Sequence, residues 1–289
     1  MTGDDTRTGT RSPNFNYPMA SGNTSSTIRL GLVDGPVDLT HPWLDEDRFR
    51  ILPQPSQPSI APPLQAHGTY VAGIVGARPS CPFPGVFAEG TIAVRIVFGA
   101  GNGHQFDSQQ TSAIELAEGI IDLVNVGATV INISAAVRHL TTKGQRRLAD
   151  ALDFAASEQR LVIVAGGNAG LVAGSILTQH PWTIPIVACD DRGSPIANAS
   201  LSRSISQTGF CYPGRVTSLA PGSKHVTHSG SSGAAAKVSG HLAQALADHS
   251  DWHPSQLRER LYGEFPSDRR QLNPPRFVPE WLGASLSSR

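Results

Sequence analysis

The chain has neither an excess of one charge nor a long apolar run, and both absences narrow what it can do. Its 23 basic and 23 acidic side chains give a formal net charge of zero, so nothing indicates a nucleic acid or a membrane surface as a partner. No run approaches the roughly 18 apolar residues that cross a bilayer. Residues 1–27 are polar and lack the apolar stretch of a secretory signal. We therefore expect a disordered tail there and residence in the cytoplasm.

Cysteine is also scarce, with three residues in a chain of 289. Cys81, Cys189 and Cys211 are an odd number, and they lack the spacing of a metal site. Cys189 ends an apolar stretch, which predicts a small residue in or near the core. Cys81 and Cys211 lie in proline-rich segments, and the sequence leaves open whether they pair. We favour free thiols in a reducing compartment, and we expect no metal and no cofactor.

Strand-like and helix-like segments alternate along the chain. The pattern predicts one domain over residues 28–264, a polar tail at 1–27 and a proline-containing tail at 265–289. Apolar β-branched runs predict strands, and apolar residues at helical spacing predict helices. The strands are expected at 28–33, 130–134, 161–165 and 184–188, and the helices at 110–126 and 145–159. This alternation predicts an α/β fold, with a doubly wound, mainly parallel sheet and helices on both faces. Residues 45–66 are polar and then proline-rich, which predicts a loop.

Four short segments carry the residue types of a serine hydrolase. In chain order they are LVDGPVD (32–38) with Asp34, HGTYVAG (67–73) with His67, AGGN (165–168) with Asn168, and GSSGAAAKVSG (230–240) with Ser232. A carboxylate at a strand end can accept a hydrogen bond from an imidazole and stabilise its charged form. Small residues after His67 and Ser232 predict two closely packed helices. The free N–H groups at a helix start favour an oxyanion.

Each of these residues alone has a plainer interpretation. Asp34 could be a turn carboxylate, His67 a helix cap, Ser232 an N-cap and Asn168 a turn residue. Taken together, an acid, a base, a nucleophile and a polarising amide are the parts of an enzyme that forms an acyl-enzyme. Their order and their flanking residues favour that second interpretation.

The four segments resemble those of the subtilisin-like serine peptidases. That family carries Asp, His and Ser in this chain order, with an Asn between the His and the Ser. Residues 130–134, 180–188 and 251–257 resemble further segments of the family, so the resemblance spans roughly residues 28–264. The motif Asp-Gly-Pro-Val-Asp at 34–38 resembles the subtilisin-like proteases that mature cyanobactin-type ribosomal peptides.

The resemblance implies a serine endopeptidase that acts on a peptide or precursor peptide. It implies Asp34, His67 and Ser232 as the catalytic triad, and Asn168 with the backbone N–H of Ser232 as the oxyanion hole. An extended substrate would lie along two backbone segments that flank the first specificity pocket. These segments are Ser134, Ala135 and Ala136, and Ala165, Gly166 and Gly167. Neither a nucleic acid nor a membrane partner is expected, and the oligomeric state is left open.

The chain departs from the family pattern close to the predicted site. Gly35 follows the aspartate where the family usually has Ser or Thr, Gly233 directly follows the serine, and Ala236 replaces a proline. We expect Gly233 and Ala236 to loosen the start of that helix. Two alternatives therefore stay open. One is a peptide transferase or macrocyclase on the same triad, in which an amine replaces water, and the other is a pseudoprotease that only binds peptides.

The calcium site common in secreted members of the family is not expected here. Trp43 stands at one of its carboxylate positions, and the loop at 78–84 has no carboxylate or amide side chain. Calcium needs six to eight oxygen ligands, and these segments offer too few.

Overall fold

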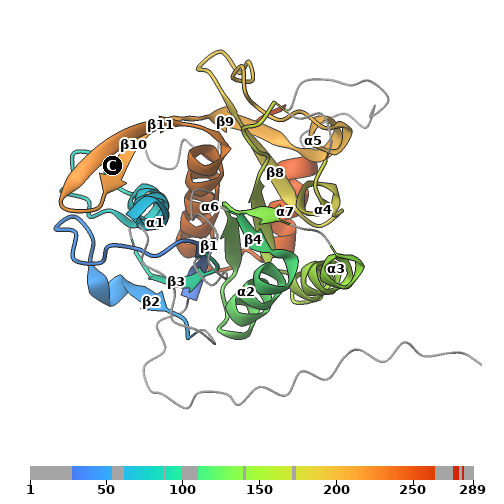
Figure 1. Ribbon diagram of the computed structural model, residues 1–289, viewed down its shortest axis with the longest axis horizontal. Helices are drawn as coiled ribbons and strands as arrows, with labels where there is room; N and C mark the ends of the chain where they lie inside the picture. Colours follow the sequence, from blue (N-terminus) through green and yellow to red (C-terminus); the bar gives the residue numbers. More distant parts are fainter. Residues whose placement is uncertain are drawn as a thin grey trace, which may run out of the picture.

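A computed structural model describes residues 28–53, 62–87, 89–98, 110–138, 141–170, 174–263, 276–279 and 282. Eight strands within these residues form one central sheet (Figure 1). In chain order they are β1 (Ile28–Asp34), β2 (Phe49–Ile51), β3 (Thr91–Ile96), β5 (Val130–Ile133), β7 (Leu161–Ala165), β8 (Ile184–Cys189), β9 (Phe210–Pro213) and β12 (Arg276–Phe277).

The sheet is parallel throughout, and its strand order is β12-β9-β8-β7-β5-β1-β3-β2. The chain builds outwards from β1 in both directions, with β3 on one side and β5 on the other. In such sheets the point where the strand order reverses leaves a crevice at the carboxyl ends of the strands. Asp34 is the last residue of β1, so it lies at that point.

Seven helices accompany the sheet in the described part of the chain. They are α1 (Pro62–Gly76), α2 (Ala113–Asn125), α3 (Thr142–Ser157), α4 (Ile176–Gln179), α5 (Arg203–Thr208), α6 (Ser231–Asp248) and α7 (Pro254–Gly263). A short 3₁₀ helix covers Glu46–Arg48. Two strand pairs stand apart from the main sheet: parallel β4 (Gln110–Ser112) with β6 (Ala136–Arg138), and antiparallel β10 (Arg215–Ala220) with β11 (Lys224–Ser229).

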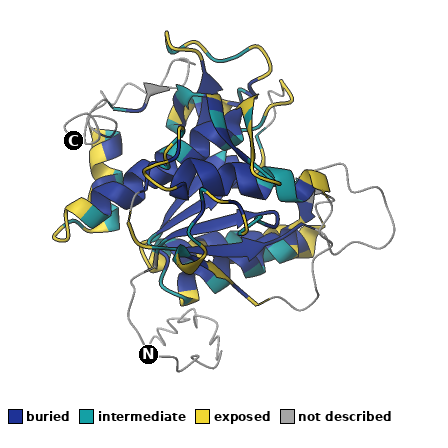
Figure 2. Cartoon of the chain, turned by 90° about the vertical axis from the view of Figure 1, so that its left-hand side faces the viewer, coloured by how far each residue is buried: buried dark blue, intermediate teal, exposed yellow. Residues whose placement is uncertain are grey.

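The apolar side chains of β1 alternate between two cores. Leu30 and Leu32 pack in the core with α1 and α6, whereas Val33 packs in the core with α2 and α3. Helices thus cover both faces of the sheet, which confirms the predicted α/β fold. Figure 2 shows the consequence, since buried residues fill the centre of the molecule and exposed ones lie on its outer turns. The long helix α6 is buried along most of its length.

Two sequence predictions of local structure are wrong. The helix expected over 110–126 begins only at Ala113, because Ser112 caps it by accepting a hydrogen bond of 3.1 Å from the N–H of Glu115. The loop expected over 45–66 contains β2 and the first turn of α1. Prolines are tolerated in a first turn, where the missing N–H would have no partner. His67 therefore lies inside α1 and does not begin it.

Part of the segment predicted as a C-terminal tail packs on the domain. β12 pairs in parallel with β9 at the sheet edge. Val278 and Leu282 are buried in the same core as α6 and α7. Residues 276–279 and 282 therefore contribute to the folded unit.

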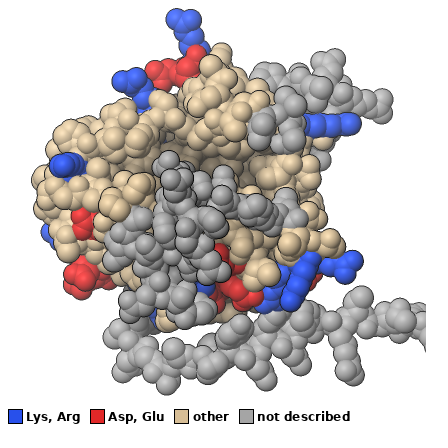
Figure 3. Space-filling model, in the orientation of Figure 1, with Lys and Arg blue, Asp and Glu red and all other residues tan. Residues whose placement is uncertain are grey.

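The surface carries no large single-sign patch on the face that Figure 3 shows. Among the described residues there, acidic and basic side chains are few and lie mostly at the margins of the face. None of the helices in the described residues has the length and apolar composition needed to cross a membrane.

Candidate active site

Asp34 and His67 are in direct contact. The Nδ1 atom of His67 lies 2.7 Å from Oδ1 of Asp34, and their side chains are 9% and 1% exposed. The backbone N–H of Gly35 donates to the same oxygen at 2.6 Å. Burial opposes the charged imidazolium, but the charge and the hydrogen bond of the Asp34 carboxylate outweigh it, so the pKa of His67 lies above its ordinary value. This pair can hold one imidazole tautomer and stabilise its protonated form.

The second oxygen of Asp34 is buried, and no donor among the described residues reaches it. Most buried polar atoms have a partner, so this one needs an explanation. A side chain on residue 35 could supply a hydroxyl, but its Cβ would collide with the carbonyl of Leu64 in α1. The close approach of α1 therefore accounts for Gly35, where the family usually has Ser or Thr. Because residue 35 supplies no hydroxyl to the second oxygen, His67 is the only side chain among the described residues that bonds the Asp34 carboxylate.

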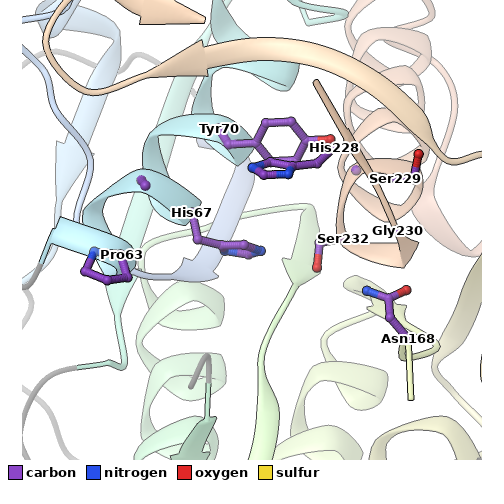
Figure 4. Close-up of a pocket in the computed structure, with 10 residues that line it drawn as sticks. Pro63, His67, Tyr70, Asn168, His228, Ser229, Gly230 and Ser232 are labelled. Carbon is purple, nitrogen blue, oxygen red and sulfur yellow. The ribbon is translucent and has the colours of Figure 1, made fainter. Parts of the chain in front are cut away.

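Ser232 is the second residue of α6 and is partly exposed. It lies at a cavity of about 390 Å³ together with His67 and Asn168 (Figure 4). The start of α6 presents N–H groups that have no partner within the helix, and its dipole favours negative charge there. The cavity is lined by Pro63, Ala66, His67, Tyr70, Asn168, His228, Ser229, Gly230, Ser232 and Gly233. The structure thus brings His67, Ser232 and Asn168 to one opening, with Asp34 behind His67.

Asn168 follows β7 on an exposed loop, and its amide is held in one orientation. Its Oδ1 accepts a hydrogen bond of 2.8 Å from the backbone N–H of Ser231. Its Nδ2 is turned towards Ser232, as Figure 4 shows. A Cβ on Gly230 would lie 2.8 Å from that Nδ2. Any larger residue at position 230 would therefore push the Asn168 amide out of this orientation. The amide can then donate to negative charge that develops beside Ser232.

Ser231 joins the two sides of the site, and sequence reasoning missed it. Besides its N–H bond to Asn168, its buried Oγ accepts a hydrogen bond of 3.1 Å from the N–H of Gly167. The loop that carries Asn168 is therefore fastened to the start of α6. The sequence did contain a signal, namely a second hydroxyl residue directly before the predicted nucleophile.

The two predicted substrate-binding segments lie at the carboxyl ends of β5 and β7. Ser134 and Ala135 directly follow β5 and are buried, and Ala136 begins β6, where it pairs with Gln110. One edge of β6 is thus already paired with β4, so a substrate strand could not pair along that edge. Ala165 ends β7.

The backbone after β7 is also partly occupied. The N–H of Gly166 donates to Ile186 at 2.8 Å, and the N–H of Gly167 donates to Ser231. These two N–H groups are therefore not available to pair with a substrate strand. If Ala165, Gly166 and Gly167 bind a substrate, they do so through atoms other than these two N–H groups, or by van der Waals contact alone.

The three cysteines are buried free thiols. Cys211 lies beside Cys189 across β8 and β9, and a hydrogen bond between the two thiols, together with burial, raises the pKa of Cys189. Cys81 belongs to a different core cluster. The pairing of Cys81 with Cys211 that the sequence left open is therefore not found. Among the described residues, no group of three or more His, Cys, Asp or Glu side chains gathers as a metal site.

The sequence matches the subtilase family over residues 25–268. Subtilisin amylosacchariticus from Bacillus subtilis subsp. amylosacchariticus is 28% identical over 246 residues, which cover 84% of this chain and 61% of that protein. The chain thus spans about three fifths of the length of this relative.

Solved structures agree with that match. The patellamide maturation protease PatA is 26% identical with a TM-score of 0.72, and the comparison covers 90% of this chain and 96% of that one. The prenylagaramide maturation protease PagA has the same fold at 24% identity, with a TM-score of 0.74 and coverage of 90% and 94%. The family match covers most of the chain and includes the segments that hold Asp34, His67 and Ser232, so the chain belongs to the subtilase family.

Proposed function

We propose that this chain is a serine endopeptidase that cleaves peptide bonds through an acyl-enzyme. One observation carries the proposal. His67 is bonded to Asp34 at 2.7 Å and opens on its other side to the cavity that Ser232 and Asn168 share. A nucleophile, a base with its orienting carboxylate and an amide donor around one cavity are what acyl transfer needs.

In the first half of the reaction, Ser232 Oγ attacks the carbonyl carbon of the scissile bond. His67 Nε2 takes the hydroxyl proton as the C–O bond forms, and Asp34 accepts from Nδ1–H and stabilises the imidazolium. The negative charge on the carbonyl oxygen falls between Nδ2 of Asn168 and the N–H of Ser232. His67 then gives its proton to the leaving amine as the C–N bond breaks.

In the second half, water enters where the amine left. His67 takes a proton from the water, the oxygen attacks the acyl carbon, and the tetrahedral species collapses to release the carboxylic acid. The proton returns to Ser232 Oγ. If a peptide amine entered in place of water, the product would be a new peptide bond. The product therefore distinguishes a peptidase from a transferase.

We propose a precursor peptide as the substrate. Two observations support this class. The motif at 34–38 resembles that of precursor-processing proteases, and a solved relative at 26% identity is a patellamide maturation protease. The peptide would lie between the segments 134–136 and 165–167, which end two adjacent strands of the sheet.

The proposal is tested by mass spectrometry of a precursor peptide incubated with the purified chain. We expect defined hydrolysis products from the wild type and no products above background from Ser232→Ala. Ser157→Ala is the matched control, because this exposed hydroxyl bonds only its own helix end at 2.8 Å, and it should cleave as the wild type does. A wild-type chain that binds the peptide without cleaving it, or that yields only ligated product when an amine is added, would contradict the proposal.

A further inference from the structure

Tyr70 touches both sides of the candidate active site. It lies on α1, one turn after His67, and its side chain is 3% exposed. Its hydroxyl donates to the carbonyl of Val216 in β10 at 3.4 Å. Its ring meets His228 of β11 edge-on, with centroids 5.1 Å apart and an interplanar angle of 79° (Figure 4). The side chain thus spans from the helix of His67 to the strands that lead to Ser232.

Tyr70 also fills the space beside the residue that follows Ser232. A methyl group on Gly233 would lie 2.6 Å from Oη of Tyr70, well inside van der Waals contact. The next neighbours of that methyl group would be Cγ2 of Val216 at 3.3 Å and Cζ of Tyr70 at 3.5 Å. The tyrosine hydroxyl is therefore the main obstacle to an alanine at this position, and the Val216 methyl group would have to shift only slightly.

This contact changes the interpretation of Gly233. The sequence suggested that this glycine loosens the helix start, yet it lies buried inside α6. Glycine within a helix costs about 1 kcal/mol relative to alanine. The close approach of Tyr70 gives a specific reason for that cost.

We propose that Tyr70 is a positioning residue, whose hydroxyl, seated against Gly233, sets the separation between His67 and Ser232. The inference rests on the proposed function, in which these two residues are base and nucleophile. His67 and Tyr70 move together because they share α1, and Ser232 and Gly233 move together because they share α6. The Tyr70–Gly233 contact is therefore a spacer between the two helices at the level of the reacting atoms.

The spacer matters because proton transfer depends steeply on geometry. A displacement of about 1 Å can lower a rate by roughly 10²-fold. The hydroxyl is suited to this role because its bond to the Val216 carbonyl keeps it in the space that a Cβ on Gly233 would need. Burial also raises the pKa of Tyr70, so the spacer is a neutral hydroxyl at ordinary pH.

A double-mutant cycle tests the proposal, with the labelling rate by a fluorophosphonate as the first readout. Gly233→Ala places a methyl group against the hydroxyl and should label about 10–100-fold more slowly than the wild type. Tyr70→Phe removes the spacer and should label about 3–10-fold more slowly. The double variant exchanges the hydroxyl for a methyl group, so it should label faster than either single variant. Tyr262→Phe removes a hydroxyl bonded to Thr208 on α5 at 2.9 Å and should label as the wild type does.

Crystal structures of the wild type, Gly233→Ala and the double variant give a second readout that does not need activity. The distance from His67 Nε2 to Ser232 Oγ should grow by about 0.5 Å or more in Gly233→Ala and return in the double variant. A double variant that labels no faster than Gly233→Ala, or an unchanged distance in Gly233→Ala, would overturn the proposal.

Two further outcomes are decisive. If the wild type is not labelled at all, the proposed function fails, while the measured distances still judge the spacer. If Gly233→Ala does not fold, the double variant carries the test, because its methyl group no longer meets a hydroxyl at 2.6 Å and is close only to the movable Cγ2 of Val216, at 3.3 Å. It should then fold and label within about threefold of the wild type, and a folded double variant that is not labelled would contradict the spacer.

Discussion

The side-chain oxygen of Asn168 accepts a hydrogen bond of 2.8 Å from the backbone N–H of Ser231, the residue before Ser232. This bond decides which end of the amide faces the cavity. Because the N–H of Gly167 donates to the hydroxyl of the same Ser231 at 3.1 Å, one residue fixes the Asn168 amide beside Ser232. The alignment exists before any substrate binds.

Loss of the Asn168 amide should reduce turnover far more than binding. We expect Asn168→Ala to lower kcat by about 10²–10³-fold, which is the loss known for removal of one oxyanion-hole donor in subtilisin. KM should change by less than about threefold. Ser231→Ala keeps the backbone bond to Asn168 and loses only the acceptor for Gly167, so a loss of about tenfold is expected. Steady-state kinetics on a cleavable peptide measure kcat and KM of the two variants. An equal loss in binding would mean that Asn168 only shapes the turn.

The pH dependence of activity should reflect the Asp34–His67 pair. His67 must be neutral to accept the serine proton, so activity falls as the pH drops through its pKa. Since that pKa is raised in the protein, the acidic limb of kcat/KM should have its midpoint above the ordinary value of about 6.5. Asp34→Asn removes the charge that raises the pKa and leaves the burial that lowers it.

The midpoint in Asp34→Asn should therefore move downwards, and the maximum rate should fall by about 10⁴-fold, as for the corresponding change in a chymotrypsin-type triad. A pH–rate profile of both proteins measures the shift. An acidic limb that is the same in the two proteins would show that Asp34 does not control His67.

Calcium should not stabilise the loop at 78–84. The guanidinium of Arg78 donates to the carbonyl of Leu44 at 3.1 Å and lies 3.8 Å from Asp45. The Arg78 cation thus lies against the Leu44 carbonyl and the Asp45 carboxylate, two oxygen donors that a calcium ion beside this loop would need. We expect the melting temperature to change by less than about 2 °C between millimolar calcium and excess chelator. A rise of more than about 5 °C with calcium would contradict this prediction.

The segment around Val278 should contribute to stability. Val278 is 4% exposed and packs in the core beside α6 and α7. Val278→Asp would bury a carboxylate among apolar side chains, so thermal unfolding should show a loss of several kcal/mol. Ile51→Asp is the control, because Ile51 is 38% exposed on the edge strand β2, and it should cost about 1–2 kcal/mol, well below the loss in Val278→Asp. Equal stability in the two variants would mean that residues 276–279 only rest on the surface.

The parts of the fold that the sequence predicted well are those with a repeated physical pattern. The buried strands β7 and β8 are continuous apolar runs, β5 is apolar except for Asn132, and α3 shows apolar residues at helical spacing. The missed elements have no such pattern. Strands β2 and β4 are three residues long and exist because they pair with β3 and β6. The first turn of α1 contains two prolines, which usually indicate a loop.

The candidate site divides in the same way. Asp34, His67, Asn168 and Ser232 were predicted because each stands in a motif of several residues. Ser231 and Tyr70 were missed because their roles depend on contacts between segments that are far apart in the sequence. Tyr70 and Gly233 are 163 positions apart, yet they meet at the cavity. Only the packed structure reveals that the missing side chain of Gly233 leaves the space that the Tyr70 hydroxyl fills.

The central claim is that Ser232 is a nucleophile activated by His67. Its most direct test is the covalent labelling of the purified chain with a fluorophosphonate, followed by peptide mapping of the labelled residue. The account predicts one label per chain on Ser232, no label on Ser232→Ala, and labelling slowed by about 10³-fold or more in His67→Ala. A label on another residue, or a wild-type chain that remains unlabelled while it is folded, would contradict it.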